Sequence, residues 1–295
     1  MSTLPPPQAA VPIPQPASAI PKSSLPGVNV MLMGPAGTGK THSIGTLVDA
    51  GVEVFYLGLE SGLESLFGYY TDQGKPIPDR LHWHTVAPPN ASFAEMIDAA
   101  NKINQFSLDA LAKMTDPNKG KHNQFVSLLN ALNNFTDERD GKAYGPVNSW
   151  GVDRCLAIDG LTGMCRCAMS LVVGGKAVKS QSDWGIAQDT VEKLVRMLCD
   201  SCKCHFVLIS HVERETDQVL GGVKLMPSAL GKALPPKLPP MFSDAILTVR
   251  EGSTWKWDTA SALADVKTRN LPINAGNSPT FAPIIAKWKA RGGVL

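Results

Sequence analysis

An eight-residue stretch near the amino terminus constrains the fold of this chain more than any other feature. Residues 34–41 fit the phosphate-binding loop pattern G-x-x-x-x-G-K-[ST] at every fixed position. Such a loop follows a buried strand and opens a helix, because its backbone N–H groups must point inward at phosphate oxygens. The flanking sequence fits this order: residues 28–33 predict a buried strand, and residues 41–50 predict a short helix closed by Gly51.

Each residue type in the loop has a distinct part in holding a nucleoside triphosphate. Gly34, Gly37 and Gly39 supply unusual backbone angles and let the main chain approach the ligand closely. Lys40 is expected to reach the β- and γ-phosphates, and the Thr41 hydroxyl to bind Mg²⁺. We therefore predict that ATP and Mg²⁺ bind here, with the nucleotide contacted by Gly34, Pro35, Ala36, Gly37, Thr38, Gly39, Lys40 and Thr41.

Composition and charge restrict the class of protein only loosely. The chain has 295 residues, of which 43% are hydrophobic, and this predicts a soluble core in one large domain or two small ones. No apolar run approaches the 18 or so residues that span a bilayer, and the amino terminus lacks the layout of a signal peptide. The expected location is therefore the cytoplasm, without membrane contact. A net charge of +2 leaves nucleic-acid binding open, because affinity follows local basic clusters.

The cysteines allow two interpretations. Six are present, namely Cys155, Cys165, Cys167, Cys199, Cys202 and Cys204. In an intracellular chain they are reduced thiols or metal ligands rather than disulfides. Cys199, Cys202 and Cys204 have a spacing that suits a metal, but they are expected at the opposite edge of the sheet from Cys165 and Cys167. Small buried apolar side chains are the favoured interpretation, and a zinc site is the alternative.

Strands and helices alternate along most of the chain. Residues 1–26 are rich in Pro and Ala and predict a disordered tail, either a spacer or a docking segment for a replication or recombination protein. Strands are then predicted at 52–60, 81–86, 154–159 and 205–211, and helices at 161–171 and 184–201. This alternation is typical of an α/β fold with a mostly parallel central sheet and flanking helices.

Two regions depart from this alternation. Residues 92–150 predict a helical and loop insertion, with no identifiable chemistry. The carboxyl third is β-rich, with strands expected at 244–250, 254–259 and 262–268. The core domain is thus expected to span 27–270, followed by a carboxyl-terminal extension over 271–295.

A phosphate loop also needs an acid on the metal side and a group that orients water. Asp159 ends an apolar strand and suits the metal-side role, with a helix N-cap as the alternative. The next residue is Gly160, where many P-loop ATPases have their water-orienting glutamate, so this base must come from elsewhere. Glu60 ends the strand after the loop's helix, and parallel strands bring their carboxyl ends to one edge. We therefore favour Glu60 as the base, over a role as a helix cap.

His211 ends a further core strand at the same expected edge. A polar residue there can contact the γ-phosphate and report its loss to the following loop. A lone histidine is more often structural than functional. On position alone, both interpretations stay open.

The order of these motifs resembles that of the RecA-like ATPases, and in particular the compact, core-only members encoded by bacteriophages, some of them associated with single-strand annealing and recombination. The resemblance covers about residues 28–270 and is weakest over 92–150. It is carried by residues 34–41, 59–62, 157–159, 183–185, 208–215, 221–224, 227, 231–232 and 265–269. It implies a RecA-like P-loop core that hydrolyses ATP with Mg²⁺ and assembles into homo-oligomers.

The resemblance implies roles for individual residues. Glu60 would be the catalytic glutamate, Asp159 the metal-side acid, and His211 the γ-phosphate sensor, where many RecA-like proteins have Gln. Lys267 and Arg269 match a K-x-R element that completes the ATP site of a neighbouring subunit. By spacing alone these two side chains share one face of a strand, which allows a two-pronged contact; a solvated strand face is the alternative.

The family's DNA-contacting loops correspond here to residues 173–183 and 212–224. Both are predicted to be flexible and modestly basic, and they lack the aromatic residues that would stack on bases. The candidate DNA contacts are Lys176, Lys179, Arg214 and Lys224. DNA binding thus follows from the resemblance rather than from these residues alone.

A phosphate-binding loop in this setting leaves three functions to distinguish. The first is an ATPase that acts on single-stranded DNA in recombination or replication, as a ring or filament whose subunits share ATP sites. The second is a nucleotide-switched interaction protein such as a helicase loader. A small-molecule kinase is disfavoured, because no arginine-rich lid segment is evident. If the protein is phage-encoded, it would work in the host cytoplasm.

Overall fold

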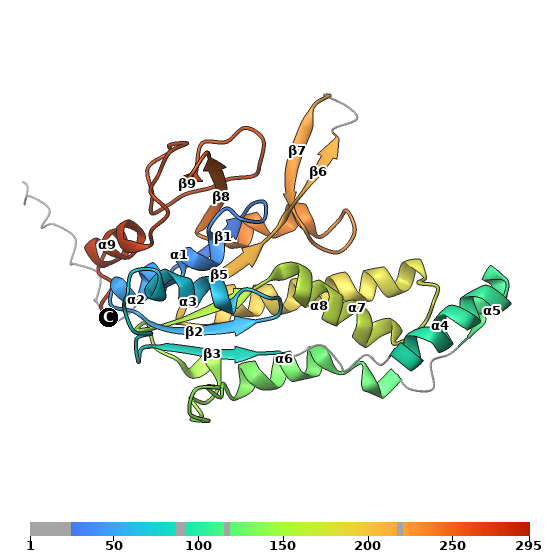
Figure 1. Cartoon of the computed structure of the whole chain (residues 1–295). Coiled ribbons are helices and arrows are strands. Elements are labelled where there is room, and N and C mark those ends of the chain that lie inside the picture. Colours follow the sequence, from blue (N-terminus) through green and yellow to red (C-terminus); the bar gives the residue numbers. More distant parts are fainter. Residues whose placement is uncertain (1–24, 87–92, 115–118, 217–220) are drawn as a thin grey trace, which may run out of the picture.

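The computed structural model describes residues 25–86, 93–114, 119–216 and 221–295. Nearly all of the predicted tail, residues 1–26, therefore lies outside the described residues. A seven-stranded sheet in the order β3-β2-β4-β5-β1-β8-β9 runs through the molecule (Figure 1). Its strands are β1 (Asn29–Met33), β2 (Glu53–Gly58), β3 (Leu81–Thr85), β4 (Arg154–Asp159), β5 (His205–Ser210), β8 (Asp244–Glu251) and β9 (Thr254–Asp258). Neighbours from β3 to β8 are parallel, and β9 runs antiparallel to β8.

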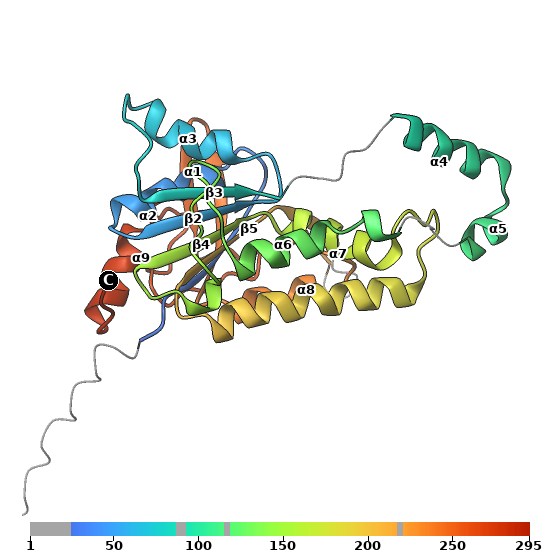
Figure 2. The ribbon, with the colours of Figure 1, turned by 90° about the horizontal axis from the view of Figure 1, so that it is seen from below.

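Helices cover both faces of this sheet, which is why its central strands are apolar along their whole length. One face carries α1 (Lys40–Ser43), α2 (Gly45–Asp49), α3 (Leu63–Thr71) and α9 (Ala282–Ala290), and the other carries α6 (Gln124–Asn133), α7 (Leu161–Val173) and α8 (Gln181–Ser201) (Figures 1 and 2). Alternate residues of each strand pack into two cores, one on each face of the sheet. Leu32 packs on the α1–α3 face, and Met31 packs on the α6–α8 face. The predicted α/β fold with a mostly parallel sheet, flanking helices and a β-rich carboxyl-terminal part is confirmed.

The register of the sheet brings the predicted site residues to one edge. Gly58 at the end of β2 pairs with Asp159 at the end of β4, and Met33 at the end of β1 pairs with Ser210 at the end of β5. Residues that follow these four strands therefore emerge next to one another. The fold thus gathers four short motifs that are far apart in the sequence.

A β-hairpin replaces the flexible loop expected at residues 212–224. Strands β6 (Val212–Thr216) and β7 (Val223–Pro227) pair antiparallel and project from the core (Figure 1). Most of their residues are at least partly exposed on both faces, so no apolar alternation marks them in the sequence. The loop prediction was therefore wrong for these two segments, because backbone pairing rather than side-chain burial defines them.

The strand predicted at 262–268 does not form, although these residues lie in the described part of the chain. Two single bridges form there instead, Leu225 with Ala264 and Ala245 with Lys267. Strand β9 already pairs with β8 from Leu247 onward, so this segment can reach β8 only at Ala245. Competition for the same strand edge thus prevents a full strand.

The carboxyl-terminal residues pack into the core on the α2 side of the sheet. Phe281, Ile284 and Trp288 are buried, and the indole N–H of Trp288 donates to the carbonyl of Pro26 at 2.8 Å. Helix α9 was not predicted, because its apolar pattern spans little more than two turns. Residues 271–295 are therefore continuous with the core in their packing.

Two further helices, α4 (Phe93–Gln105) and α5 (Leu108–Lys113), extend away from the body of the molecule (Figure 2). They belong to the region predicted as an insertion. Helix α8 begins three residues earlier than predicted, at Gln181, because Ser180 and Asp183 form a capping box. Among the described helices, none has the length and apolarity needed to cross a membrane.

Candidate nucleotide-binding site

The phosphate-binding loop connects β1 to α1, as its motif requires, and its geometry explains the glycines. Gly37 and Gly39 have φ values of 74° and 76°, in the left-handed region that favours glycine. Gly34 is needed for a different reason: a Cβ there would lie 2.1 Å from Oγ1 of Thr248 and 2.5 Å from its carbonyl oxygen. The close approach of β8 to the loop therefore excludes any side chain at position 34.

Lys40 folds over the loop and is almost fully buried. Its ammonium donates to the carbonyl oxygens of Gly34, at 2.8 Å, and Pro35, at 2.7 Å. Burial lowers the pKa of Lys40 to about 8, although the carboxylates of Asp159 and Glu60 counteract this. An anionic phosphate bound beside this buried ammonium would stabilise its charged form. This supports the predicted role of Lys40.

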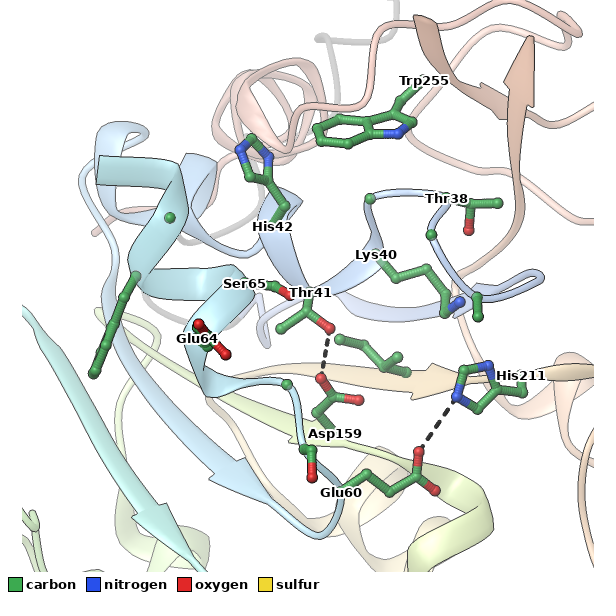
Figure 3. Close-up of a pocket in the computed structure, with 18 of the residues that line it drawn as sticks. Thr38, Lys40, Thr41, His42, Glu60, Glu64, Ser65, Asp159, His211 and Trp255 are labelled. Atoms are coloured by element: carbon green, nitrogen blue, oxygen red, sulfur yellow. Dashed lines mark hydrogen bonds and ion pairs between the residues drawn. The ribbon is translucent and has the colours of Figure 1, made fainter. Parts of the chain in front are cut away.

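Thr41 and Asp159 lie together beneath the loop (Figure 3). The Thr41 hydroxyl donates to Oδ2 of Asp159 at 2.6 Å, and the buried Tyr56 hydroxyl donates to the same oxygen at 3.0 Å. Burial raises the pKa of Asp159, while these two hydrogen bonds oppose the rise. A hydroxyl and a carboxylate side by side are the oxygen ligands that Mg²⁺ prefers, so the residues fit this ion. Tyr56 escaped prediction because an aromatic residue within a buried strand looks like core.

The carboxylate of Glu60 is fixed from two sides. Its Oε1 accepts the N–H of Gly163 at 2.7 Å and lies 3.8 Å from Nη2 of Arg166, both on α7. Its Oε2 lies 3.4 Å from Nε2 of His211 (Figure 3). The structure therefore brings together Lys40, Glu60, Asp159 and His211, all of which the sequence singled out. Arg166 was not foreseen, because it lies outside every motif.

Glycines at the start of α7 allow this approach. A Cβ on Gly160 would lie 3.1 Å from Oε2 of Glu60. A Cβ on Gly163 would lie 2.7 Å from the carbonyl oxygen of Leu59, closer than real Cβ atoms come. The loop that carries Glu60 thus rests directly on the backbone of α7.

Replacing Gly163 tests this packing. We expect Gly163→Ala to lower ATP hydrolysis at least about tenfold and to destabilise the fold by about 1–3 kcal/mol, because α7 must move away from Leu59. The matched control is Gly185→Ala on α8, where a Cβ meets nothing within 4 Å. That change should raise stability by about 0.5–1 kcal/mol. Thermal melts and ATPase rates check both variants, and equal rates for the two would contradict the expectation.

The loop and the acids line a pocket of about 650 Å³, within the range of small-molecule sites. The rim on the other side of the phosphate loop from the acids is aromatic. Trp255 of β9 packs against Gly39, and the centroid of its ring lies 4.8 Å from that of the His42 ring (Figure 3). Aromatic side chains beside a phosphate loop can bind the base of a nucleotide. Trp255 escaped prediction, since nothing in the sequence places β9 beside the loop, and His42 did so because it lies just past the last fixed position of the loop motif.

Lys267 and Arg269 lie elsewhere. Lys267 bridges Ala245 near the start of β8, which is the opposite edge of the sheet from the phosphate loop. Its ammonium donates to the carbonyl oxygen of Phe242 at 2.8 Å, and burial lowers its pKa. Arg269 is exposed. Neither residue lines the pocket of its own chain, and no strand gives the two a common face.

The candidate DNA contacts are spread over two separate elements. In the α7–α8 loop, Lys176 lies 3.7 Å from a carboxylate oxygen of Asp183, and Lys179 lies over a tryptophan ring. On the hairpin, Lys224 pairs with Asp265 at 2.7 Å, and Arg214 is exposed. Of the four, Arg214 is therefore the side chain with least competition from neighbouring groups.

All six cysteines are buried as free thiols. Within the described ranges, no group of three or more His, Cys, Asp or Glu side chains could hold a metal ion. Burial raises the pKa of Cys199 and Cys165 to about 12. Five of the six pack in the core on the α7–α8 side of the sheet and Cys155 packs in the core on the other side, which agrees with the apolar interpretation of these residues.

A family model described as an AAA domain matches residues 27–271. The chain belongs to this family. Together with the phosphate loop and the parallel sheet, this membership identifies a P-loop ATPase domain. ATP and Mg²⁺ are the ligands typical of such a domain. No curated protein matches the chain.

Several solved structures resemble this AAA-domain protein at low identity. The RadB recombinase is 13% identical with a TM-score of 0.37, over 85% of each chain. The flagellar accessory protein FlaH from Methanocaldococcus jannaschii is 10% identical with a TM-score of 0.34, over 79% of this chain and 77% of that one. A prototypical type III secretion ATPase of pathogenic bacteria is 12% identical with a TM-score of 0.38, over 76% of this chain. This chain spans about half, 53%, of the secretion ATPase.

Proposed function

We propose that the protein is a Mg²⁺-dependent ATPase that acts on single-stranded DNA in recombination or replication. The observation that carries the ATPase part is the placement of Glu60. Its carboxylate is held by the Gly163 N–H and faces His211, at the same sheet edge as Lys40 and the Thr41–Asp159 pair. The proposed base, the proposed phosphate-binding cation and the proposed metal-ligand pair thus line one pocket.

In the proposed reaction, Glu60 accepts a hydrogen bond from water and directs its oxygen at the γ-phosphate. Lys40 and the backbone N–H groups of the loop bind the phosphate oxygens on which negative charge accumulates. Thr41 and Asp159 would hold Mg²⁺, which supplies neutralisation of that charge when bound. The indole of Trp255 and the His42 ring, which lie beside the phosphate loop, would contact the base.

His211 links this chemistry to the hairpin. It immediately precedes β6, and its carbonyl oxygen accepts the N–H of Ser228, just after β7, at 2.8 Å. A change in the contact between His211 and Glu60 would therefore shift the backbone at the base of the hairpin that carries Arg214. This connection supports coupling between hydrolysis and a ligand held by the hairpin.

Subunit sharing is supported by the placement of Lys267 and Arg269. These residues lie at the amino edge of the sheet, whereas the phosphate loop lies at the carboxyl edge. Head-to-tail stacking of copies would bring one edge against the other, and such heterologous contacts generate rings or filaments. The exposed Arg269 would then contact the phosphates of the neighbouring site.

The DNA part is tested by ATP hydrolysis with and without single-stranded DNA. We expect stimulation in the wild type, loss of stimulation with normal basal rate in Arg214→Glu, and no hydrolysis in the Lys40→Ala background control. Reversing one exposed charge should also reduce the salt dependence of DNA binding. Equal hydrolysis with and without DNA, in protein shown not to bind it, would contradict this function. That result would favour the nucleotide-switched interaction protein, such as a helicase loader.

Subunit sharing is tested by mixing two inactive variants. Glu60→Gln removes the base from a chain's own site, and Arg269→Ala removes the group offered to a neighbour. In a mixture, some sites combine an intact Glu60 with an intact Arg269 from the Glu60→Gln partner. Activity should therefore return partly and peak at an intermediate ratio. Additive rates at every ratio would exclude sharing.

A further inference from the structure

The α4–α5 segment, residues 93–113, forms an arm on which most of the large apolar side chains face solvent, with Leu111 of α5 the buried exception. No residue of α4 is buried, and the arm extends well beyond the body of the molecule (Figures 1 and 2). Six large apolar residues on it are exposed: Phe93 by 85%, Met96 by 61%, Ile97 by 61%, Ile103 by 58%, Phe106 by 43% and Leu108 by 70%. Contact between water and this much apolar surface is unfavourable, so we expect another apolar surface to cover the arm.

The apolar residues of α4 form one stripe. At 3.6 residues per turn, Phe93, Met96, Ile97 and Ile103 all lie within about 60° of Ala100 around the helix axis. Their spacing of three and four residues is that of a helix–helix seam. The charged residues of the helix, Glu95, Asp98 and Lys102, lie on the opposite side. Two such stripes can therefore meet without bringing like charges together.

The exposed apolar surface of the whole arm is close to one side of a stable interface. With side-chain areas of about 150–250 Å² and the exposed fractions above, the four residues of the α4 stripe present roughly 500 Å², and Phe106 and Leu108 bring the total to roughly 700 Å². A standard interface buries about 800 Å² per partner. Elsewhere on the described surface, large exposed apolar residues occur singly or in pairs, such as Val126 and Leu129 on α6. In area and apolarity, the surface that best matches the arm is another arm.

We infer that the arm is a homotypic docking element: the α4 helices of two copies pack antiparallel about a two-fold axis near Ala100. In this arrangement Ile97 of one copy faces Ile103 of the other, and the small Ala100 side chains let the helices approach. Self-complementary pairing is the commonest symmetry of soluble oligomers. The contact goes beyond the proposed function, because the arm lines neither the nucleotide pocket nor the edge that carries Arg269.

The mass of the full-length protein in solution tests this pairing. By light scattering after gel filtration without nucleotide, the wild type should have twice the mass of a Met96→Glu/Ile97→Glu variant at the same concentration. Gln105→Glu adds a charge to the polar side of the same helix and should keep the wild-type mass. Because α4 buries nothing, circular dichroism and ATPase rate per chain should stay unchanged in all three. Equal masses for the wild type and the double variant would overturn the inference, whatever the ATPase result.

A cysteine cross-link tests the antiparallel register. The native cysteines are buried, so an introduced thiol is the reactive one. Under mild oxidation Ala100→Cys should form a disulfide dimer at least about tenfold faster than Asp98→Cys, which lies on the charged side. Equal cross-linking of the two would overturn the register. A single-copy wild type that becomes dimeric only when residues 1–24 are deleted would instead identify the tail as the occupant. A single-copy wild type that binds anionic vesicles through Met96 would identify a lipid surface, and both outcomes overturn the inference.

Discussion

Glu60→Gln is expected to lower the rate of ATP hydrolysis by about 10²–10⁴-fold while ATP still binds, because the amide cannot accept the proton of the attacking water. The substitution keeps the shape of the side chain. The amide oxygen can still accept the Gly163 N–H that holds Oε1 at 2.7 Å. Rates measured at saturating ATP, with affinity measured separately by isothermal titration, separate the chemical step from binding.

Glu64 provides the matched control for this variant. It lines the same pocket and lies four residues further along, but it is exposed on the first turn of α3. Glu64→Gln removes the same charge and should change the rate less than about threefold. If Glu64→Gln loses as much activity as Glu60→Gln, the general charge of the pocket rather than a positioned base drives hydrolysis.

Lys40→Ala has the second large effect and acts on binding. A charge-assisted contact to phosphate contributes about 1.5–3 kcal/mol, so losing it should weaken ATP affinity by up to about 100-fold. Lys287→Ala, a surface change on α9, is the control and should leave affinity unchanged. Isothermal titration of nucleotide into each variant gives the comparison.

The pKa of Lys40 adds a pH signature to the same experiment. Because burial lowers this pKa to about 8, the ammonium is charged at pH 7 and largely neutral at pH 9. Wild-type affinity for ATP should therefore fall by about tenfold between these two values, by proton linkage. Lys40→Ala should show a flat profile over that range. A wild-type profile as flat as that of the variant would show that this lysine does not titrate there.

The nucleotide site was largely predictable because its residues belong to short local sequence motifs. The fixed spacing of the phosphate loop located Lys40 and Thr41, and apolar strands ending in acids located Asp159 and Glu60. The rule that parallel strands end at one edge then placed them together. The structure adds that His211 faces Glu60 directly, at 3.4 Å, which position alone left open.

What escaped prediction depends on contacts between distant segments. Tyr56 looked like an ordinary core residue, although its hydroxyl contacts Asp159, and Trp255 comes beside Gly39 only because β9 folds back on β8. The β6–β7 hairpin lacks an apolar face, so its strands leave no periodic signal. In each case tertiary context, rather than local propensity, decides the outcome.

Gly160 leaves the Glu60 carboxylate the room that it occupies. A Cβ at position 160 would lie 3.1 Å from Oε2 of Glu60, so a side chain there would require the carboxylate to move by a few tenths of an ångström. Such a move would disturb the contact in which Oε1 of Glu60 accepts the N–H of Gly163 at 2.7 Å. A glutamate introduced after Asp159 is therefore expected to compete with Glu60 for its position rather than to add a second base.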